Sequence, residues 1–314
     1  MSDPLRGLPV LGVGASLSLA ARPDPVALVA APGGPDFVEY AGLVDVEAVI
    51  DEVRRIRAAG AAILFHPSCV NFCGSFPNAD AWLDAIAVHV QAVGSPWFAQ
   101  DCAYCFWDGG PAYASQFGWF IPPILNRASL DRAVERVREV RDRVPVSVAI
   151  EPPPVTFAVG SMPLFEFFGE LAERADCALL LDMGHLVSWE LATGVPVTDA
   201  LDALPGERVV EVHVAGGEIE THANGSIYVD AHERPVQPRT WEMLERMLPE
   251  LPGLRAVCFE CEGIGEDDVL ATLATLRERV RQHGASPFLV ASLDPGLDAR
   301  ADGGPGAADR GEHP

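Results

Sequence analysis

The sequence predicts an α/β protein, and more specifically a (β/α)8 barrel of the TIM type. Eight short apolar segments alternate with amphipathic helical patterns over about 280 residues, and a barrel of this kind typically takes about 250. The competing architecture is a doubly wound open sheet, whose dinucleotide-binding form has G-x-G-x-x-G after the first strand. This chain has only "GVGAS" at that point. We therefore expect one barrel domain over residues 1–285 and a disordered tail, rich in Gly, Ala, Asp and Pro, over residues 286–314.

The predicted strands are short apolar runs bounded by Gly, Pro or charged residues. Parallel strands with helices on both faces of the sheet read as near-continuous apolar runs, because both faces are buried. In a barrel the first strand must pair with the last one. The segments that fit are residues 8–15, 36–42, 61–66, 95–101, 146–151, 177–182, 208–214 and 255–262.

The segments between the strands repeat apolar residues at helical spacing. Residues 45–60 place Val46, Val49 and Val53 on one stripe, with Asp45 as the expected N-cap and Gly60 as the stop. Similar patterns predict helices over residues 79–94, 129–144, 163–175, 238–251 and 266–284.

The segment after the fourth strand, residues 102–127, is longer than an ordinary βα loop and contains seven aromatic residues. On the rim of a barrel such a segment borders the active site. It is expected to form either a lid or substrate groove, or a capping mini-core.

Composition limits the partners and the compartment. The net charge of −23 argues against a nucleic-acid partner, because such binding relies on clustered Lys and Arg. The N-terminus lacks the pattern of a secretory signal, and no apolar run reaches the length of about 18 residues that a membrane span needs. Seven cysteines, an odd number, favour reduced thiols in the cytoplasm. We expect a cytoplasmic protein that binds neither nucleic acid nor membrane.

Histidines and carboxylates stand at or near the ends of six consecutive predicted strands. The carboxyl ends of barrel strands meet at one face, where the active sites of such enzymes lie. Imidazole nitrogen and carboxylate oxygen are ligands that iron, zinc and manganese share. A carboxylate buried there without a cation or a hydrogen-bond donor would be costly. The sequence therefore predicts a metal centre with these candidate ligands: His66, Asp101, Glu151, Asp182, His185, His213, Asp230, His232 and Glu260.

Asp230 and His232 are also predicted to be essential for catalysis. They fall in the loop that we expect after the strand at 208–214, and two residues of an extended segment that are two apart share a face. We expect them to bind one ion together with His213.

The candidate ligands carry a resemblance to known metal barrels. Glu151, Asp182-x-x-His185, His213, Asp230-x-His232 and Glu260 resemble the xylose-isomerase-like and endonuclease IV group. A wider resemblance, over about residues 8–275, is to the multinuclear non-haem iron oxidative enzymes of methanobactin and thiaglutamate biosynthesis, which belong to the same barrel superfamily. Its matching segments include "ALLLDMGHLVSWELATG", "VVEVHVAGG", "YVDAHERPVQPRTWEML" and "VCFECEG". The most specific of them is Asp-x-His followed by Pro-Val and Trp.

This resemblance implies two or three iron ions, O2 as the oxidant, and a ribosomal peptide whose cysteine thiolate binds iron before it is oxidised. It also implies that a partner protein presents the peptide. The positions that match the metal pattern of the family are His66, Glu151, Asp182, His213, Asp230, His232 and Glu260.

Three departures from the family pattern indicate a divergent member. The family usually has Ser-Glu-His after strand four, where this chain has Asp101 in place of the His. The family often has Asp-x-Asn-Asn after strand six, where this chain has Gly184 and His185. The family often ends strand seven with Gly-His, where this chain has Gly217 in place of the His. His185 can compensate as a ligand.

Other functions remain open at this point. A sugar isomerase or epimerase would use one or two divalent ions, with Glu151 and Glu260 as ligands or bases. DNA repair of the endonuclease IV type is disfavoured by the charge. A degenerate barrel that only binds a partner would be consistent with Asp101, Gly184 and Gly217. The metal content separates most of these alternatives: two or three irons, one zinc or manganese, or none.

Overall fold

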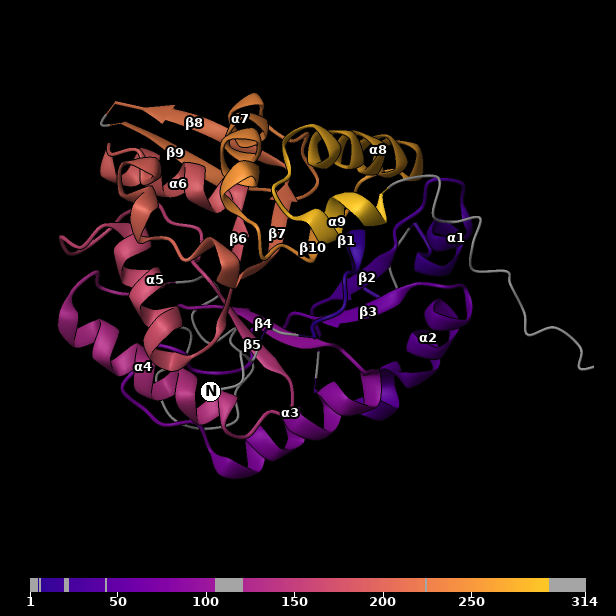
Figure 1. Cartoon of the computed structure of the whole chain (residues 1–314), viewed down its shortest axis with the longest axis horizontal. Helices are drawn as coiled ribbons and strands as arrows, with labels where there is room; N and C mark the ends of the chain where they lie inside the picture. The colour runs from indigo at the N-terminus through magenta and orange to yellow at the C-terminus, as the bar shows by residue number, and fades with distance from the viewer. Residues whose placement is uncertain are drawn as a thin grey trace, which may run out of the picture.

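The computed structural model describes residue 5 and residues 7–19, 23–42, 44–104, 121–223 and 225–293. Eight parallel strands close into a barrel in the order β1-β10-β7-β6-β5-β4-β3-β2, which confirms the predicted (β/α)8 fold (Figure 1). The first strand pairs with the last, with Gly12 opposite Ala256. The barrel strands are β1 (Gly12–Ser16), β2 (Phe37–Tyr40), β3 (Ala62–Phe65), β4 (Trp97–Asp101), β5 (Ser147–Glu151), β6 (Ala178–Asp182), β7 (Val209–Ala215) and β10 (Ala256–Glu260).

Helices surround the barrel as an outer layer (Figure 1). Asp45 caps α2 as predicted, because its side chain accepts a hydrogen bond from the Ala48 amide. The helix predicted from Ser129 begins earlier, at Arg127, since Asn126 is the residue that caps it. The helices are α1 (Pro25–Ala30), α2 (Val46–Ala58), α3 (Asp80–Val93), α4 (Arg127–Arg141), α5 (Leu164–Ala175), α6 (Met183–Thr193), α7 (Pro238–Met247), α8 (Glu266–His283) and α9 (Pro287–Ser292), with 3-10 turns at Val197–Ala203, Gly206–Arg208 and Leu248–Glu250.

A β-hairpin follows β7 where the sequence predicts only a loop. Strands β8 (Gly217–His222) and β9 (Gly225–Asp230) pair antiparallel outside the barrel, and β9 packs on α6 (Figure 1). The prediction that Asp230 lies in a loop is therefore wrong, because Asp230 is the last residue of β9. His232 lies in the turn that follows the hairpin. The two strands pair in register from Gly217 opposite Asp230 to His222 opposite Gly225.

The interior of the barrel is apolar toward the amino ends of the strands, here called the floor, and polar at their carboxyl ends. Alternate residues of a strand share a face, so the pattern that builds the apolar floor also turns the last inward side chain toward the barrel mouth. The floor contains Phe37, Leu64, Trp97, Ala149, Leu180 and Cys258. An inward polar residue follows each of them two positions further along the chain, or four positions further on β4. These residues are Glu39, His66 (directly after β3), Asp101, Glu151, Asp182 and Glu260.

The beginning of the predicted tail is part of the fold. Residues 287–292 form α9, whose Leu289 is buried. The Ser286 hydroxyl donates a hydrogen bond to the Leu254 carbonyl and its oxygen caps α9. The expectation of a disordered tail is thus wrong for residues 286–293, because Leu289 and Leu293 are buried and Val290 packs against the core. The rest of that expectation falls on residues 294–314, which lie outside the described residues.

Among the described helices, none is both long enough and apolar enough to span a membrane.

Candidate metal centre

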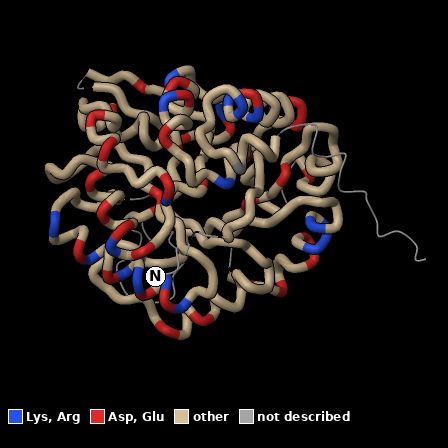
Figure 2. Tube along the Cα trace, viewed as in Figure 1, with Lys and Arg blue, Asp and Glu red and all other residues tan. Residues whose placement is uncertain are grey.

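Acidic side chains enter the barrel without basic partners. The barrel strands contain Glu39, Asp101, Glu151, Asp182, Glu211 and Glu260, and they contain neither Lys nor Arg. In the described part of the chain, the basic residues lie on the outer helices and in loops (Figure 2). A buried carboxylate is stable only when a hydrogen-bond donor or a cation compensates its charge. The four imidazoles at the same face are the candidates for the first role, and bound metal ions for the second.

His66 lies among three carboxylates at the mouth of the barrel. It follows β3 directly, and its amide donates a hydrogen bond to the Tyr40 carbonyl. Its Nε2 atom is 3.2 Å from Glu151 Oε2 and 3.9 Å from Asp101 Oδ2. Its Nδ1 atom is 3.7 Å from Glu39 Oε2, which is too far for a hydrogen bond. The contacts of His66 thus extend to both sides of its ring.

His185 is oriented by the backbone. Its Nδ1 atom lies 3.0 Å from the Pro152 carbonyl oxygen, which accepts a hydrogen bond from a ring N–H, so in the neutral ring Nε2 has the lone pair. That Nε2 atom is 3.4 Å from Asp230 Oδ2. Asp182 caps α6 by accepting from the His185 amide at 2.7 Å, and its second oxygen, Oδ2, is buried without a hydrogen-bond partner. The structure therefore presents a lone pair and a bare carboxylate oxygen in the same region.

Glu260 lies between two histidines, His213 of β7 and His232 after the hairpin. His213 Nδ1 is 3.4 Å from Glu260 Oε1, and His232 Nε2 is 3.6 Å from Glu260 Oε2. His232 Nε2 is also 3.5 Å from Asp230 Oδ2. The other nitrogen of His232 is 2.8 Å from Glu262 Oε2, an arrangement that is typical of ligating histidines. Asp230 and His232 therefore converge as the spacing predicts, and Glu260 stands between them and His213.

The donor atoms fall into overlapping groups that suit metal ions. Ligands at about 2.0–2.2 Å from one ion lie within about 4.4 Å of each other, and the atoms of each group lie within 4.8 Å of one another. Buried atoms without hydrogen-bond partners occur in these groups, including Glu151 Oε1, Asp182 Oδ2 and both ring nitrogens of His213. A set of carboxylates and imidazoles fits iron, zinc or manganese. The groups are Glu39–His66–His213, His66–Asp101–Glu151, Glu151–Asp182–His185 and Asp182–His213–Glu260.

Electrostatics within the centre also favour a cation. Burial raises the pKa of Glu151 to about 7, and the charge of Asp101 adds to the increase. Burial raises the pKa of Asp182 to about 6, with Glu260 and Asp230 contributing against the opposite effect of His185. Carboxyl groups that resist ionisation because of burial and like charges are groups whose ionised form a metal ion stabilises.

All nine predicted ligands lie in this cluster, either in one of the four groups or, for Asp230 and His232, in contact with members of them. Sequence reasoning missed Glu39, which is 1% exposed and belongs to the first group. It also missed Glu211, which accepts a hydrogen bond from Trp97 Nε1 at 2.7 Å, and Glu262 behind His232. The available signal was a single acidic residue inside an apolar run, in "DFVEYAG" and in "RVVEVHV".

Tyr228 occupies the space next to two of the departures from the family pattern. A Cβ atom on Gly217 would lie 2.2 Å from the Tyr228 hydroxyl, and one on Gly184 would lie 2.7 Å from it. Tyr228 is 2% exposed, and its hydroxyl is 3.3 Å from Thr240 Oγ1. The phenol ring fills the volume that side chains at positions 184 and 217 would need. Tyr228 can therefore occupy this place only because both positions are glycine.

Gln100, which precedes the third departure, Asp101, orders the segment after His66. Its side-chain oxygen accepts from the amides of Cys69 and Val70 at 2.7 and 2.8 Å, and its side-chain nitrogen donates to the Val70 carbonyl at 2.7 Å. The β4 strand thus contributes Asp101 to the centre and fixes the neighbouring loop through the preceding residue.

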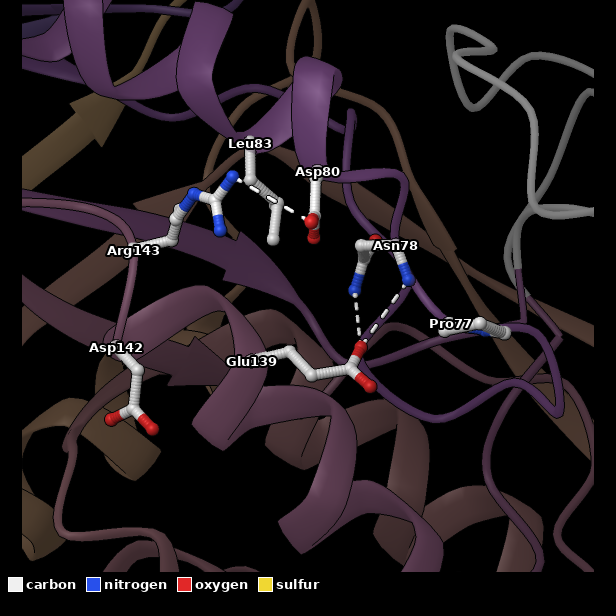
Figure 3. Close-up of a pocket in the computed structure, with 7 residues that line it drawn as sticks. All are labelled: Pro77, Asn78, Asp80, Leu83, Glu139, Asp142 and Arg143. Carbon is white, nitrogen blue, oxygen red and sulfur yellow. Dashed lines mark hydrogen bonds and ion pairs between the residues drawn. The ribbon is translucent and has the colours of Figure 1, made fainter.

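Two of the hollows lined by described residues lie outside the centre. One, of about 300 Å³, is lined by residues of α3 and α4, and its polar groups bond to each other, as Asn78 does to Glu139 and Arg143 to Asp80 (Figure 3). The other, of about 450 Å³, begins next to the centre, because Glu233 follows His232. Its apolar lining residues are Pro235, Val236, Trp241, Phe259, Ile264 and Ala271.

The lid or groove expected over residues 102–127 falls mostly on residues 105–120, which lie outside the described residues. The flanks of this segment are bridged, since the Tyr104 amide donates to the Ile121 carbonyl at 2.8 Å.

Solved structures similar to this one support the fold. A crystal structure of D-psicose 3-epimerase, determined in the presence of D-fructose, has a TM-score of 0.55 at 14% identity and covers 88% of this chain and 100% of its own. Endonuclease IV from Thermus thermophilus has a TM-score of 0.54 at 18% identity, with 86% and 99% covered. A xylose isomerase domain protein from Planctomyces limnophilus has a TM-score of 0.56 at 13% identity, with 88% and 99% covered. These likenesses, all below 20% identity, support the closed parallel barrel fold.

Relatives and a family model give more specific information. A UPF0276 protein from Streptomyces avermitilis is 29% identical over 246 residues, which are 76% of this chain and 49% of that protein. A second UPF0276 protein, from Neisseria meningitidis serogroup B, is 25% identical over 201 residues, which are 63% of this chain and 69% of that protein. The chain thus spans between about half and about two thirds of the length of these relatives. Residues 36–281, most of the barrel, match a family model, and the chain belongs to the family that this model describes, the RiPP precursor modification enzymes MbnB/TglH/ChrH.

Proposed function

We propose that this chain is a multinuclear non-haem iron enzyme that uses O2 to oxidise a cysteine of a ribosomally made peptide. The observation that carries the proposal is the sharing of donors between groups. His66, Glu151, Asp182 and His213 each belong to two of the four groups, so the groups form one continuous cluster. A carboxylate has two oxygens and can bridge two ions, whereas a mononuclear site needs only three or four donors. A cluster of this size is suited to two or three ions.

The residues of this chain would hold the ions, fix their own orientation and keep bulk water away. Glu151, Asp182 and Glu260 are the suitable bridging carboxylates, because each contacts donors on both sides. The Pro152 carbonyl and Glu262 hold the N–H groups of His185 and His232, which leaves the opposite nitrogens to bind metal. When bound, iron would supply the redox chemistry and the affinity for O2 and for a thiolate that these side chains lack.

The substrate and partner are part of the proposal. Glu233 and Phe259, the sequence neighbours of His232 and Glu260, help to line the hollow of about 450 Å³, and its apolar residues are suited to an apolar side chain of the peptide. A partner protein that binds the rest of the peptide would present it at this rim. The reaction would take place in the cytoplasm, where the substrate thiol stays reduced.

The proposal is tested by metal analysis and by peptide oxidation. The chain is loaded with Fe(II) under anaerobic conditions, and bound iron per chain is measured. O2 is then added with a short peptide that ends in cysteine, and the product is examined by mass spectrometry with the same peptide carrying serine as the control. Two or three irons per chain and a mass change only in the cysteine peptide are expected.

A different result would favour the second enzyme class. One zinc or manganese per chain together with interconversion of ketoses would support the sugar isomerase or epimerase and overturn the proposal. If the chain binds no metal, both the iron enzyme and the sugar isomerase or epimerase would be excluded.

A further inference from the structure

Glu39 is a buried carboxylate in contact with two candidate ligands, and neither the sequence nor the family resemblance assigns it a role. It projects inward from β2 and is 1% exposed. Its Oε1 atom is 3.2 Å from His213 Nε2, and its Oε2 atom is 3.7 Å from His66 Nδ1. Oε2 has no hydrogen-bond partner. One carboxylate thus faces two imidazoles, whose ring centroids are 5.1 Å apart.

The opposite nitrogens of the same two rings face the remaining donors. His66 Nε2 is 3.2 Å from Glu151, and His213 Nδ1 is 3.4 Å from Glu260. A neutral imidazole has one lone pair and one N–H, so a ring that binds metal through one nitrogen has its proton on the other. In both rings that second nitrogen is the one that faces Glu39.

We propose that Glu39 is a positioning residue that sets the tautomers of both histidines, so that His66 ligates through Nε2 and His213 through Nδ1. Both N–H groups then point at one carboxylate, whose two oxygens can accept one hydrogen bond each. Small movements from the present 3.2 and 3.7 Å separations make both bonds. The inference rests on the proposed function to the extent that the cluster binds metal; it does not require iron, O2 or a peptide.

The neighbouring groups favour Glu39 over other acceptors for this role. Glu211 is the other carboxylate near His213 Nε2, but its Oε1 atom is 3.6 Å away, farther than Glu39 Oε1 at 3.2 Å. The Cys258 thiol, 3.8 Å from Glu39 Oε1, is a donor and not an acceptor toward that carboxylate. Glu39 is therefore the nearest carboxylate for His213 and is shared with His66.

The rival assignment places an ion between Glu39, His66 Nδ1 and His213 Nε2, whose atoms lie within 4.8 Å of one another. Such an ion would take both inner lone pairs. The outer nitrogens, next to Glu151 and Glu260, would then carry the protons. The two assignments thus differ in the position of two protons, which can be measured.

The tautomers are measured on the full chain loaded with zinc alone, because zinc is diamagnetic. Long-range ¹H–¹⁵N spectra of the histidines distinguish a protonated from a metal-bound nitrogen, and the signals are assigned from His66→Gln and His213→Gln. We expect protons at His66 Nδ1 and His213 Nε2. Protons at the opposite nitrogens, or anomalous zinc scattering between Glu39 and the two rings, would overturn the inference.

Variants measure the strength of the effect. Glu39→Gln keeps the shape of the side chain but only one acceptor oxygen, and it should weaken zinc binding about 10- to 100-fold. Glu39→Asp, which keeps the charge, should recover part of this loss. The control is Glu190→Gln, which removes a buried carboxylate bonded to Arg239 outside the centre and should leave zinc affinity unchanged. Equal zinc affinity in Glu39→Gln and the wild type would contradict the positioning role.

These results separate the inference from the proposed function. If the wild-type chain binds no zinc and no iron, the metal centre itself is wrong. If it binds zinc with the opposite tautomers, only the role of Glu39 is wrong.

Discussion

Substitution of Gly217 by alanine tests whether Tyr228 fills the space that the family gives to a side chain. A Cβ atom at 217 would lie 2.2 Å from the Tyr228 hydroxyl oxygen and 2.3 Å from Cζ, whereas ordinary contacts begin at 3.4 Å. The ring or the hairpin would have to move by about 1 Å, which is the difference between these distances. Tyr228 is buried and cannot turn into solvent without losing its packing. We expect Gly217→Ala to lower the free energy of unfolding by about 1–3 kcal/mol, as overpacking generally does.

The assay is urea unfolding of Gly217→Ala, Tyr228→Ala and the double variant, analysed as a double-mutant cycle. In the Tyr228→Ala background the overlap is gone, so the added methyl should cost less than about 0.5 kcal/mol. The difference between the two backgrounds should therefore account for most of the 1–3 kcal/mol. Gly42→Ala is the control, because its Cβ would meet nothing closer than 3.5 Å.

The reasoning fails if Gly217→Ala has the same effect in both backgrounds, since its cost would then come from the backbone and not from Tyr228. It also fails if Gly217→Ala is as stable as the wild type. In either case the two glycines and Tyr228 would have to be explained separately.

Three further predictions concern the histidines and Asp230. His66→Ala should reduce the bound metal by part of its complement and leave the far-ultraviolet circular dichroism unchanged; full metal retention would make His66 a structural residue. Asp230→Ala and His232→Ala should each abolish activity and remove about one ion, because the two side chains contact each other and His232 also contacts Glu260; metal analysis that shows no loss would exclude them as ligands. Burial lowers the pKa of His89 to about 4, so the unfolded chain binds more protons than the folded one between about pH 4 and 6.5. Stability should therefore fall by up to about 3 kcal/mol as the pH drops through this window, and His89→Leu should lose this part of the pH dependence; unfolding midpoints that respond to pH equally in both proteins would refute it.

The barrel could be predicted because its strands are buried on both faces. The runs "AAILFH" and "CALLLD" have no polar residue except at the end, and such runs alternating with helices are typical of a parallel sheet that is covered on both faces. The hairpin at 217–230 was missed because its alternation is weak and its strands are partly exposed. The Asn224-Gly225 pair was the available turn signal.

Candidate ligands that end a strand could be predicted, whereas Glu39, which lies inside one, was missed. Asp101, Glu151 and Asp182 are terminal residues of apolar runs, so their direction follows from the fold. Glu39 lies one residue before the end of β2, where the sequence alone does not say which face it occupies. Which nitrogen of a histidine meets which carboxylate depends on side-chain rotation and on partners far apart in sequence, and no local pattern encodes it.

The hairpin of β8 and β9 has a consequence for how the site is assembled. Asp230, at its end, and His232, just after it, face Glu260 of the barrel and His185 of α6. A ligand that binds Asp230 and His232 together with Glu260 and His185 connects the hairpin to the barrel. Its binding free energy therefore also stabilises the packing of the hairpin against the barrel. The amides of residues 217–230 should therefore exchange with deuterium more slowly when the site is filled, while those of the barrel floor change little. In this protein the occupied site acts as a cross-link between two parts of the fold.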